Sequence, residues 1–317
     1  MKIIRESAIH MDQSVSAQMA RLTRLQNIPR ILLLIVLIAG SAFTAAAQGS
    51  SIPTGRTGGG LDWNESFEGS TGSSGQDMEI NSSATYHFGR FSVGAGIPVY
   101  LNRAVFSNGA SISDGIGDFY VRLGSSWTNP LFNFGTAITG TAPTGDSNKG
   151  FSAGHGTFDW NNRIDRDFGG LTPFLDGGVA NSISDTLFFH RPFTSFGYLA
   201  HGELGADLDL THSFKLLVSA YTIAPWGTQT IISRDVVAGG TGSGGQNGRV
   251  FEVNHITAGP ASINYDDGLT AGITFQPKPY MSLAVGYTRS LSYEFNTFSW
   301  GIGFNMSRLV GLRNSNK

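Results

Sequence analysis

Alternation of apolar with polar or small residues is the feature that most limits the folds open to this chain. Between residues 298 and 306 every second residue is apolar, and the residues between them are Ser299, Gly301, Gly303 and Asn305. Successive side chains of a β-strand point to opposite faces, so this segment is predicted to be a strand with one apolar and one polar face. The same pattern recurs upstream in segments of similar length, which indicates an all-β protein.

The pattern and its connections predict the number of strands. Twelve segments carry it: 61–67, 78–88, 91–101, 118–127, 132–138, 157–168, 171–179, 196–210, 214–224, 263–275, 280–289 and 298–306. Long connections alternate with short ones, which are Gly89-Arg90, Asn129-Pro130, Gly169-Gly170, His212-Ser213 and Lys278-Pro279. Bacterial outer-membrane barrels have an even strand number, short periplasmic turns and long outer loops. We therefore predict a transmembrane antiparallel β-barrel of twelve strands, with a soluble periplasmic β-sandwich as the alternative fold.

The segment before the first strand predicts export. An apolar run at residues 31–38 follows three arginines, and a run of three alanines ends at Ala47. This order of basic, apolar and small residues is typical of a secretory signal peptide. We expect a signal peptide at 1–47 cleaved after Ala47, a flexible lead-in at 48–60, the barrel at 61–306 and a C-terminal periplasmic tail at 307–317. An uncleaved helix is the alternative, and the start codon stays open among Met1, Met11 and Met19.

Composition limits the partners and the chemistry. The chain has no Cys, so disulfides and thiolate metal sites are excluded. Its formal net charge of −2 lacks the basic character of nucleic-acid-binding proteins. The seven His residues form neither a His-Glu-x-x-His motif nor a close metal-binding pair, so we predict no metal and no cofactor.

Aromatic residues gather around the short turns, as an interfacial girdle predicts. They are Tyr86, Phe88, Phe91, Trp127, Phe132, Phe134, Phe168, Phe174, Phe214, Phe275 and Tyr280.

Two short motifs carry a resemblance to a known family. Gly115, Gly117 and Asp118 form a Gly-x-Gly-Asp start of one strand, and Pro143, Thr144, Gly145 and Asp146 end the next strand. This pair resembles the outer-membrane barrel family named for the meta-pathway of phenol degradation, whose members are described as porin-like transporters. The resemblance covers residues 60–306 and implies passage of aromatic or other hydrophobic compounds. It implies no catalytic residue. Outer-membrane barrels often end on an aromatic residue read by the assembly machinery, and Phe304 would fill that role although the chain continues beyond it.

Two matches to catalytic motifs have a non-catalytic explanation. Residues 150–154 read Gly-x-Ser-x-Gly and precede His155, but a nucleophile elbow needs a strand, a sharp turn and a helix. Residues 240–245 read Gly-x-Gly-x-x-Gly, but no buried strand precedes them and no helix follows. Both segments are predicted to be Gly-rich loops, so we predict that the chain is not an enzyme.

Alternation directs a set of charged side chains into the barrel lumen, because charges on the lipid face are costly. The set is Arg122, Asp159, Arg163, Asp165, Asp167, Asp176, His201, Glu203, Asp207, Asp209 and Lys215. One interpretation is an acidic, cation-favouring constriction. The other is a network of ion pairs and hydrogen bonds that makes a narrow barrel rigid. His201 with its acidic neighbours could alternatively form a metal or proton-relay site.

The predicted function is passage of small solutes, including hydrophobic or aromatic compounds, through an outer-membrane channel or transporter gated by outer loops such as 226–260. The alternatives are a closed barrel with a structural or surface-interaction role and an outer-membrane lipid-modifying enzyme. The expected partners are outer-membrane lipid, the outer-membrane assembly machinery and the solutes. The oligomeric state stays open.

Overall fold

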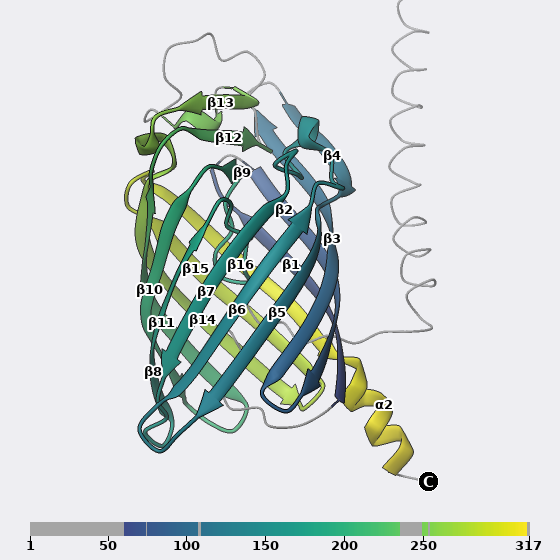
Figure 1. The fold of residues 1–317 in the computed structure, drawn as a ribbon. Coiled ribbons are helices and arrows are strands. Elements are labelled where there is room, and N and C mark those ends of the chain that lie inside the picture. The colour runs from purple at the N-terminus through teal and green to yellow at the C-terminus, as the bar shows by residue number, and fades with distance from the viewer. Residues whose placement is uncertain (1–59, 74, 107–108, 235–248, 253, 316–317) are drawn as a thin grey trace, which may run out of the picture. The chain divides into compact units, whose positions relative to one another are not determined.

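Twelve antiparallel strands close on themselves into one barrel. They are β1 (Gly60–Thr71), β2 (Gly75–Phe88), β3 (Phe91–Phe106), β5 (Phe119–Thr128), β6 (Asn133–Ala142), β7 (Thr157–Asp165), β8 (Leu171–Ala180), β10 (Leu199–Asp209), β11 (Phe214–Pro225), β14 (Asp266–Lys278), β15 (Met281–Ser290) and β16 (Phe295–Asn305). Each pairs with the next in this order, and β16 pairs with β1 from Asn64↔Asn305 to Thr71↔Phe298. Figure 1 shows the tilted strands in the barrel wall. The predicted strand number and order are confirmed.

The structure, a computed structural model, describes residues 60–73, 75–106, 109–234, 249–252 and 254–315. The predicted signal peptide, the lead-in up to residue 59 and the Gly-x-Gly-x-x-Gly match at 240–245 lie outside these residues. Among the residues that are described, no helix has the length and apolar character needed to cross a membrane.

The two faces of the wall differ as the alternation predicts. On β16, Phe298 is 49% exposed on the outside, whereas Ser299 is fully buried on the inside. Each of the twelve wall strands carries at least one exposed large apolar side chain. Such an outer surface is unfavourable in water and suits hydrocarbon. At the end with the short turns, exposed and half-buried rings stack in pairs: Tyr86 with Phe88, Phe88 with Phe91, Trp127 with Phe134 and Phe214 with Phe275. We call this the short-turn end and the opposite one the long-loop end.

The family-like motifs meet and hold each other at the long-loop end. The backbone N–H of Gly145 donates to Asp118 Oδ1 at 3.0 Å, and Thr144 Oγ1 accepts from Phe119 N at 2.8 Å. Thr144 Oγ1 also donates to Gly117 O at 3.1 Å. A side chain at Gly145 would overlap the backbone of Gly117, so only glycine allows this approach. The motifs therefore have a structural role, and they fix where the loop after β6 begins.

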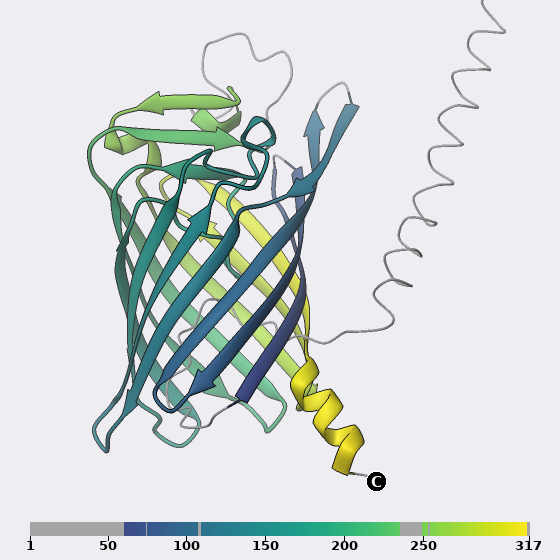
Figure 2. The ribbon, with the colours of Figure 1, turned by 45° about the vertical axis from the view of Figure 1, so that its right-hand side comes forward.

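The long connections are more ordered than the predicted loops. Residues 109–116 form β4 (Gly109–Ile116), which pairs with the end of β3 in a hairpin above the barrel rim (Figure 2). A separate small sheet of β9 (Phe193–Phe196), β12 (Gln229–Ser233) and β13 (Ile256–Gly259) lies across the long-loop end (Figure 1). The short helices η1 (Ser147–Lys149), η3 (Val250–Glu252) and η4 (Ala261–Asn264) complete these loops.

A small apolar core holds this sheet over the barrel. Phe193, Ile231, Phe251 and Phe295 form it, with Tyr293 packed against it. Phe295 belongs to the barrel wall, whereas Phe193 and Ile231 belong to the small sheet. The core therefore connects the cover to the wall.

The chain continues after β16 as the helix α2 (Met306–Ser315), which leaves the short-turn end (Figure 1). The Asn305 side chain accepts from Arg308 N at 2.9 Å and so caps the helix. Arg308 Nη1 donates to Pro279 O at 3.0 Å, which ties the first turn to the barrel.

Asp118→Ala should lower the stability of the folded barrel by about 1–2 kcal/mol, because Gly145 N–H loses a carboxylate acceptor. The temperature at which the heat-modifiable band of the folded barrel disappears on a gel measures this change. Asp114→Ala is the matched control, since Asp114 is exposed. An equal loss in both variants would contradict the structural role of the motif pair.

Candidate functional site

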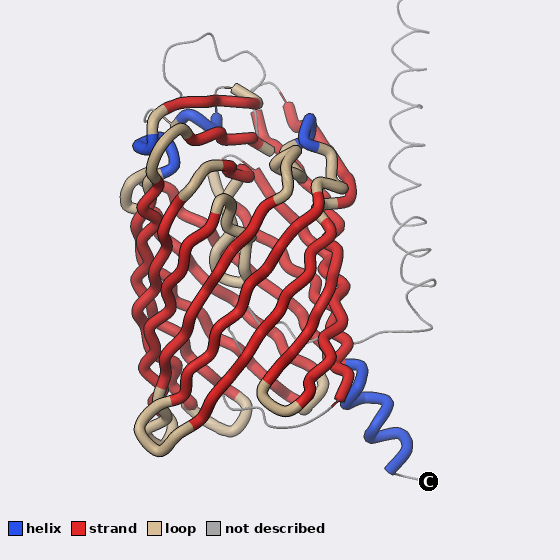
Figure 3. The backbone as a smooth tube through the Cα atoms, viewed as in Figure 1, coloured by secondary structure: helices blue, strands red, loops and turns tan. Residues whose placement is uncertain are grey.

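A loop of the chain folds into the barrel and occupies part of its lumen (Figure 3). Residues 182–192, which we call the plug, lie between β8 and β9 and enter the barrel, as the tan loop inside the strands shows in Figure 3. The tip, Leu187 and Phe188, rests on glycines of three adjacent strands: Gly272 of β14, Gly286 of β15 and Gly301 of β16. A Cβ atom at Gly272 would lie 2.8 Å from the Phe188 ring, and Cβ atoms at the other two glycines would overlap the tip. The small inner faces of these strands thus form a seat for the plug.

The rest of the plug is held by backbone and ring contacts. Thr186 N donates to Phe189 O at 2.8 Å and Phe189 N to Thr186 O at 3.0 Å, so the tip is a two-residue hairpin loop. Thr288 Oγ1 of β15 donates to Phe188 O. The Phe189 ring meets Tyr221 of β11 edge-on at 4.9 Å. The plug therefore touches β15 and β11, the two wall strands on either side of β14.

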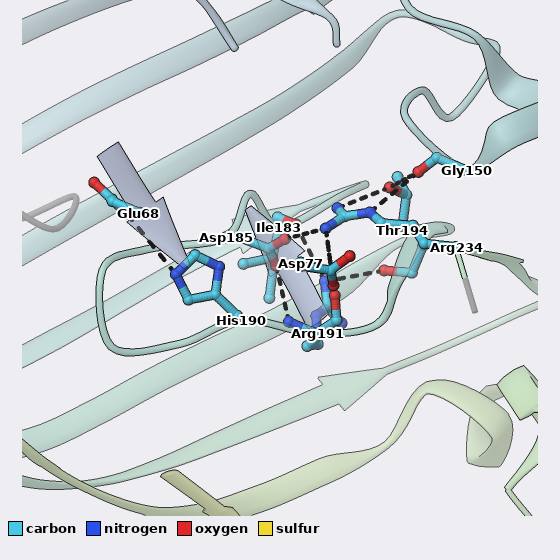
Figure 4. Close-up of polar contacts among 10 residues, drawn as sticks. Glu68, Asp77, Gly150, Ile183, Asp185, His190, Arg191, Thr194 and Arg234 are labelled. Carbon is cyan, nitrogen blue, oxygen red and sulfur yellow. Dashed lines mark hydrogen bonds and ion pairs between the residues drawn. The ribbon is translucent and has the colours of Figure 1, made fainter. Parts of the chain in front are cut away.

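Arg234, which follows β12, joins the plug to the other loops (Figure 4). Its guanidinium donates to Asp185 Oδ2 at 2.7 Å, Gly150 O at 3.3 Å, Thr194 Oγ1 at 3.3 Å and Arg191 O at 3.4 Å. It also lies 3.8 Å from Asp77 Oδ2 of β2 and 4.8 Å from the centre of the Tyr100 ring of β3. Burial alone would lower the pKa of Arg234, but Asp185 and its other acidic neighbours raise it above its ordinary value.

The plug also brings a histidine against the wall. His190 Nε2 lies 3.8 Å from Glu68 Oε2 of β1, and both side chains are buried (Figure 4). Burial lowers the pKa of His190 below its ordinary value, although Asp185 opposes this effect and Arg234 adds to it. His190 is therefore neutral at pH 7 while the plug is in place.

Four of the predicted lumen residues form one buried ion-pair network near the short-turn end. Arg163 donates from Nε to Asp165 at 3.2 Å, from Nη1 to Asp176 at 2.9 Å and from Nη2 to Asp207 at 3.3 Å. The guanidinium carbon lies 4.0 Å from the centre of the Phe174 ring. Phe174 was expected in the aromatic girdle, but it faces the lumen because its position on β8 has the same parity as Asp176.

The other predicted lumen residues lie apart from Arg163. His201 Nε2 is 2.9 Å from Asp159 Oδ1 on the inner wall. Glu203 faces Asp176 across the β8–β10 pair, and Arg122 is partly buried on the inner face of β5. Lys215 Nζ lies 2.9 Å from Asp209 Oδ1 in a largely exposed pair at the short-turn end.

Asp167 is the exception to the predicted set. It is exposed in the turn after β7, where Oδ1 accepts from Gly169 N at 2.8 Å and Gly170 N at 3.2 Å. These backbone hydrogen bonds, from Gly170 and Gly169, lower the pKa of the Asp167 carboxyl. β7 ends at Asp165, so the alternation no longer applies at Asp167 and its prediction as a lumen residue is wrong.

The arrangement favours ion pairing over an open acidic ring near the short-turn end, since one guanidinium engages three carboxylates. Within the described part of the chain, no three His, Cys, Asp or Glu side chains are grouped to hold a metal ion. Sequence reasoning missed Arg234, Asp185 and His190, because they lie on long connections. Sequence reasoning also singled out neither Glu68 nor Glu79 among the inward-facing residues.

Comparisons with known proteins identify the fold. No family model and no curated protein matches the chain. An outer-membrane channel from Pseudomonas putida F1 is similar, with a TM-score of 0.54 and 11% identity over 80% of this chain and 97% of that chain. The KdgM porin has a TM-score of 0.45 and 10% identity over 76% of this chain and 98% of the porin. The CymD monoaromatic hydrocarbon channel has a TM-score of 0.38 and 10% identity over 78% of this chain and 88% of that chain. The similarity to the Pseudomonas putida F1 channel shows a shared barrel fold. The resemblance to the phenol meta-pathway family stays a prediction.

Arg163→Met should destabilise the barrel by about 3–5 kcal/mol, because three carboxylates lose their buried partner. Urea unfolding followed by tryptophan fluorescence in detergent micelles measures the change. Lys215→Met removes one partner of an exposed pair and should cost at most about 1 kcal/mol. Equal losses in the two variants would contradict the network.

Lowering the pH from 7.5 to 5.5 should loosen the plug. In the closed state the pKa of His190 lies below its ordinary value of 6.5, so protons bind the released plug more readily than the seated one. Closure is therefore fully stable above pH 6.5 and weakens as the pH falls below it. Protease cleavage of the plug measures the release, and His190→Asn should flatten its pH dependence between these values. An unchanged pH dependence in that variant would refute the role of His190.

Proposed function

We propose that this chain is an outer-membrane channel for small solutes whose lumen the plug closes and opens. One observation carries the proposal: the segment that enters the lumen is separate from the wall. The twelve wall strands are joined by continuous backbone ladders, whereas the plug is held by its tip, by ring contacts and by the Asp185–Arg234 pair. Within the described ranges, the plug is joined to the wall through side chains and not through strand pairing. It can therefore leave without breaking the backbone ladder that keeps the barrel folded.

The class of solute comes from the resemblance and not from the lumen itself. The phenol meta-pathway family implies hydrophobic or aromatic compounds, and its motif residues are present in this chain as a structural pair. The similar barrel from Pseudomonas putida F1 is an outer-membrane channel, which supports a channel role for the same fold. Passage of aromatic compounds is thus the finer part of the proposal.

The plug, and not the predicted loop 226–260, is the gate in this proposal. The segments of that loop that the structure describes, β12, η3 and β13, cover the long-loop end from above. They would follow the plug, because Arg234 directly after β12 binds Asp185.

The lipid-modifying enzyme has less support. Ser152 is 1% exposed, and its hydroxyl accepts from Gly154 N at 2.9 Å. The ring of His155 stacks on Phe196 at 4.8 Å between centroids. A nucleophile needs an accessible hydroxyl next to a base, and a buried serine in a loop does not provide one.

Export and assembly complete the proposal. The signal peptide at 1–47 would be cleaved after Ala47, and the assembly machinery would insert the barrel into the outer membrane. The short-turn end and α2, which occupies the predicted tail, would then face the periplasm.

Single-channel recording in a planar bilayer tests the channel. The full mature chain should show rare openings, and the double variant Leu187→Gly, Phe188→Gly should open about a hundredfold more often. The reason is that the two side chains together lose about 3 kcal/mol of apolar burial at the seat. Heat-modifiable gel mobility confirms that each barrel is folded.

The chain offers a matched control for this change. Leu131 and Phe132 are the same two residue types side by side, exposed in a short turn. Leu131→Gly, Phe132→Gly should leave the opening frequency at the wild-type value. Silence of all three folded barrels would overturn the channel and favour a closed structural barrel.

A further inference from the structure

Two glutamates face each other inside the barrel near the long-loop end. Glu68 of β1 is directly opposite Glu79 of β2 in the strand register, and both belong to the inward-facing set of their strands. Glu68 is 9% exposed. Opposed residues of an antiparallel pair have Cβ atoms about 5 Å apart, so two like charges at these positions repel each other. Such a pair needs a positive charge or a proton between its members.

The surroundings add more negative than positive charge. Glu79 interacts with the carboxylates of Glu68, Asp77 and Asp185 and with one guanidinium, that of Arg234. Asp185 already engages that guanidinium at 2.7 Å, while Asp77 lies 3.8 Å from it. His190 is the remaining basic group beside Glu68, and its buried ring is neutral at pH 7. Among the described residues, these acidic side chains therefore outnumber the one guanidinium that faces them.

A buried amide beside these carboxylates has no partner in the part of the chain that the structure describes. Asn102 of β3 is opposite Asp77 in the register and is 2% exposed, and neither its Oδ1 nor its Nδ2 makes a hydrogen bond. A buried amide without partners costs free energy, so its presence indicates a ligand or water that it would bind. Asn102 Oδ1 is a further oxygen acceptor beside the acidic group.

The geometry points to an ammonium group and not to a metal ion. No three acidic or His side chains among the described residues are close enough to hold a metal. An ammonium donates three hydrogen bonds of about 2.8 Å in a tetrahedral arrangement, so its acceptors lie about 4.6 Å apart. Metal-bound oxygens must be closer together than this.

We propose that Glu68, Asp77, Glu79 and Asn102 bind the primary ammonium group of a solute inside the lumen. This inference rests on the proposed channel, because the solute must enter the barrel. It adds a recognition site for cationic amines at the long-loop end, beside the Asp185–Arg234 contact that anchors the plug. A bound ammonium would supply the positive charge that the glutamate pair lacks.

Calorimetric titration of the purified full chain in detergent at pH 8 tests the site, and it requires no conduction. Benzylammonium is the probe, and benzyl alcohol is its neutral counterpart of nearly the same shape. Benzylammonium should bind about tenfold more tightly than benzyl alcohol, because one charge-assisted hydrogen bond changes the dissociation constant by about this factor. Glu79→Gln should weaken benzylammonium binding about tenfold, and Asn102→Leu several-fold.

Glu203→Gln is the control variant, because it makes the same change on the inner wall beside Asp176. It should retain the wild-type affinity within about twofold. If Glu79→Gln fails to fold, Asn102→Leu carries the test alone. No binding by the folded wild type, equal binding of benzyl alcohol, or an equal loss in Glu203→Gln would overturn the site. Displacement of benzylammonium by equimolar Ca²⁺ would also overturn it, in favour of a metal site. Binding by a barrel that never conducts would leave the site standing and remove the channel.

Discussion

The closed backbone ladder is the constraint on which the rest of this structure depends. In hydrocarbon every backbone N–H and C=O must find a partner within the protein, and a barrel without edges achieves this. Pairing of β16 with β1 therefore joins the two ends of the wall. It also assigns each strand residue to the lipid or to the lumen, since alternation leaves no third choice. Charge and function are thus confined to the lumen and to the long connections.

The strand number, strand order and inward direction of the charged residues could be predicted because they follow from a period of two. Arg163, Asp165, Asp176 and Asp207 were expected in the lumen, and three direct contacts join them. The two errors have different causes: one residue lies beyond the end of its strand, and one aromatic residue near a short turn faces inward and not toward the lipid. Asp167 lies beyond the last residue of β7, and Phe174 has an inward parity that proximity to the short turn concealed.

The direction of a long loop has no such periodic signal. The connection between the predicted strands 171–179 and 196–210 was expected to be an outer loop, yet residues 182–192 enter the lumen (Figure 3), because their anchors come from distant parts of the chain. Arg234 is 49 residues from Asp185 and 84 residues from Gly150, which it also contacts. Of the three seat glycines, sequence analysis named only Gly301, as a small residue on the polar face of the last strand, and it named neither Gly272 nor Gly286. Their role follows from the structure, in which Leu187 and Phe188 pack directly against them.

The glycine seat restricts which side chains three positions of the wall can carry. Gly272, Gly286 and Gly301 lie within wall strands, and none of them has the positive φ that favours glycine, so the backbone itself does not require glycine there. What a side chain removes is the space for the tip of the plug. A substitution that adds a side chain at one of these positions would displace the tip of the plug from the wall. Selection for a tight cell envelope, and not for a stable protein, would then keep these three positions free of side chains.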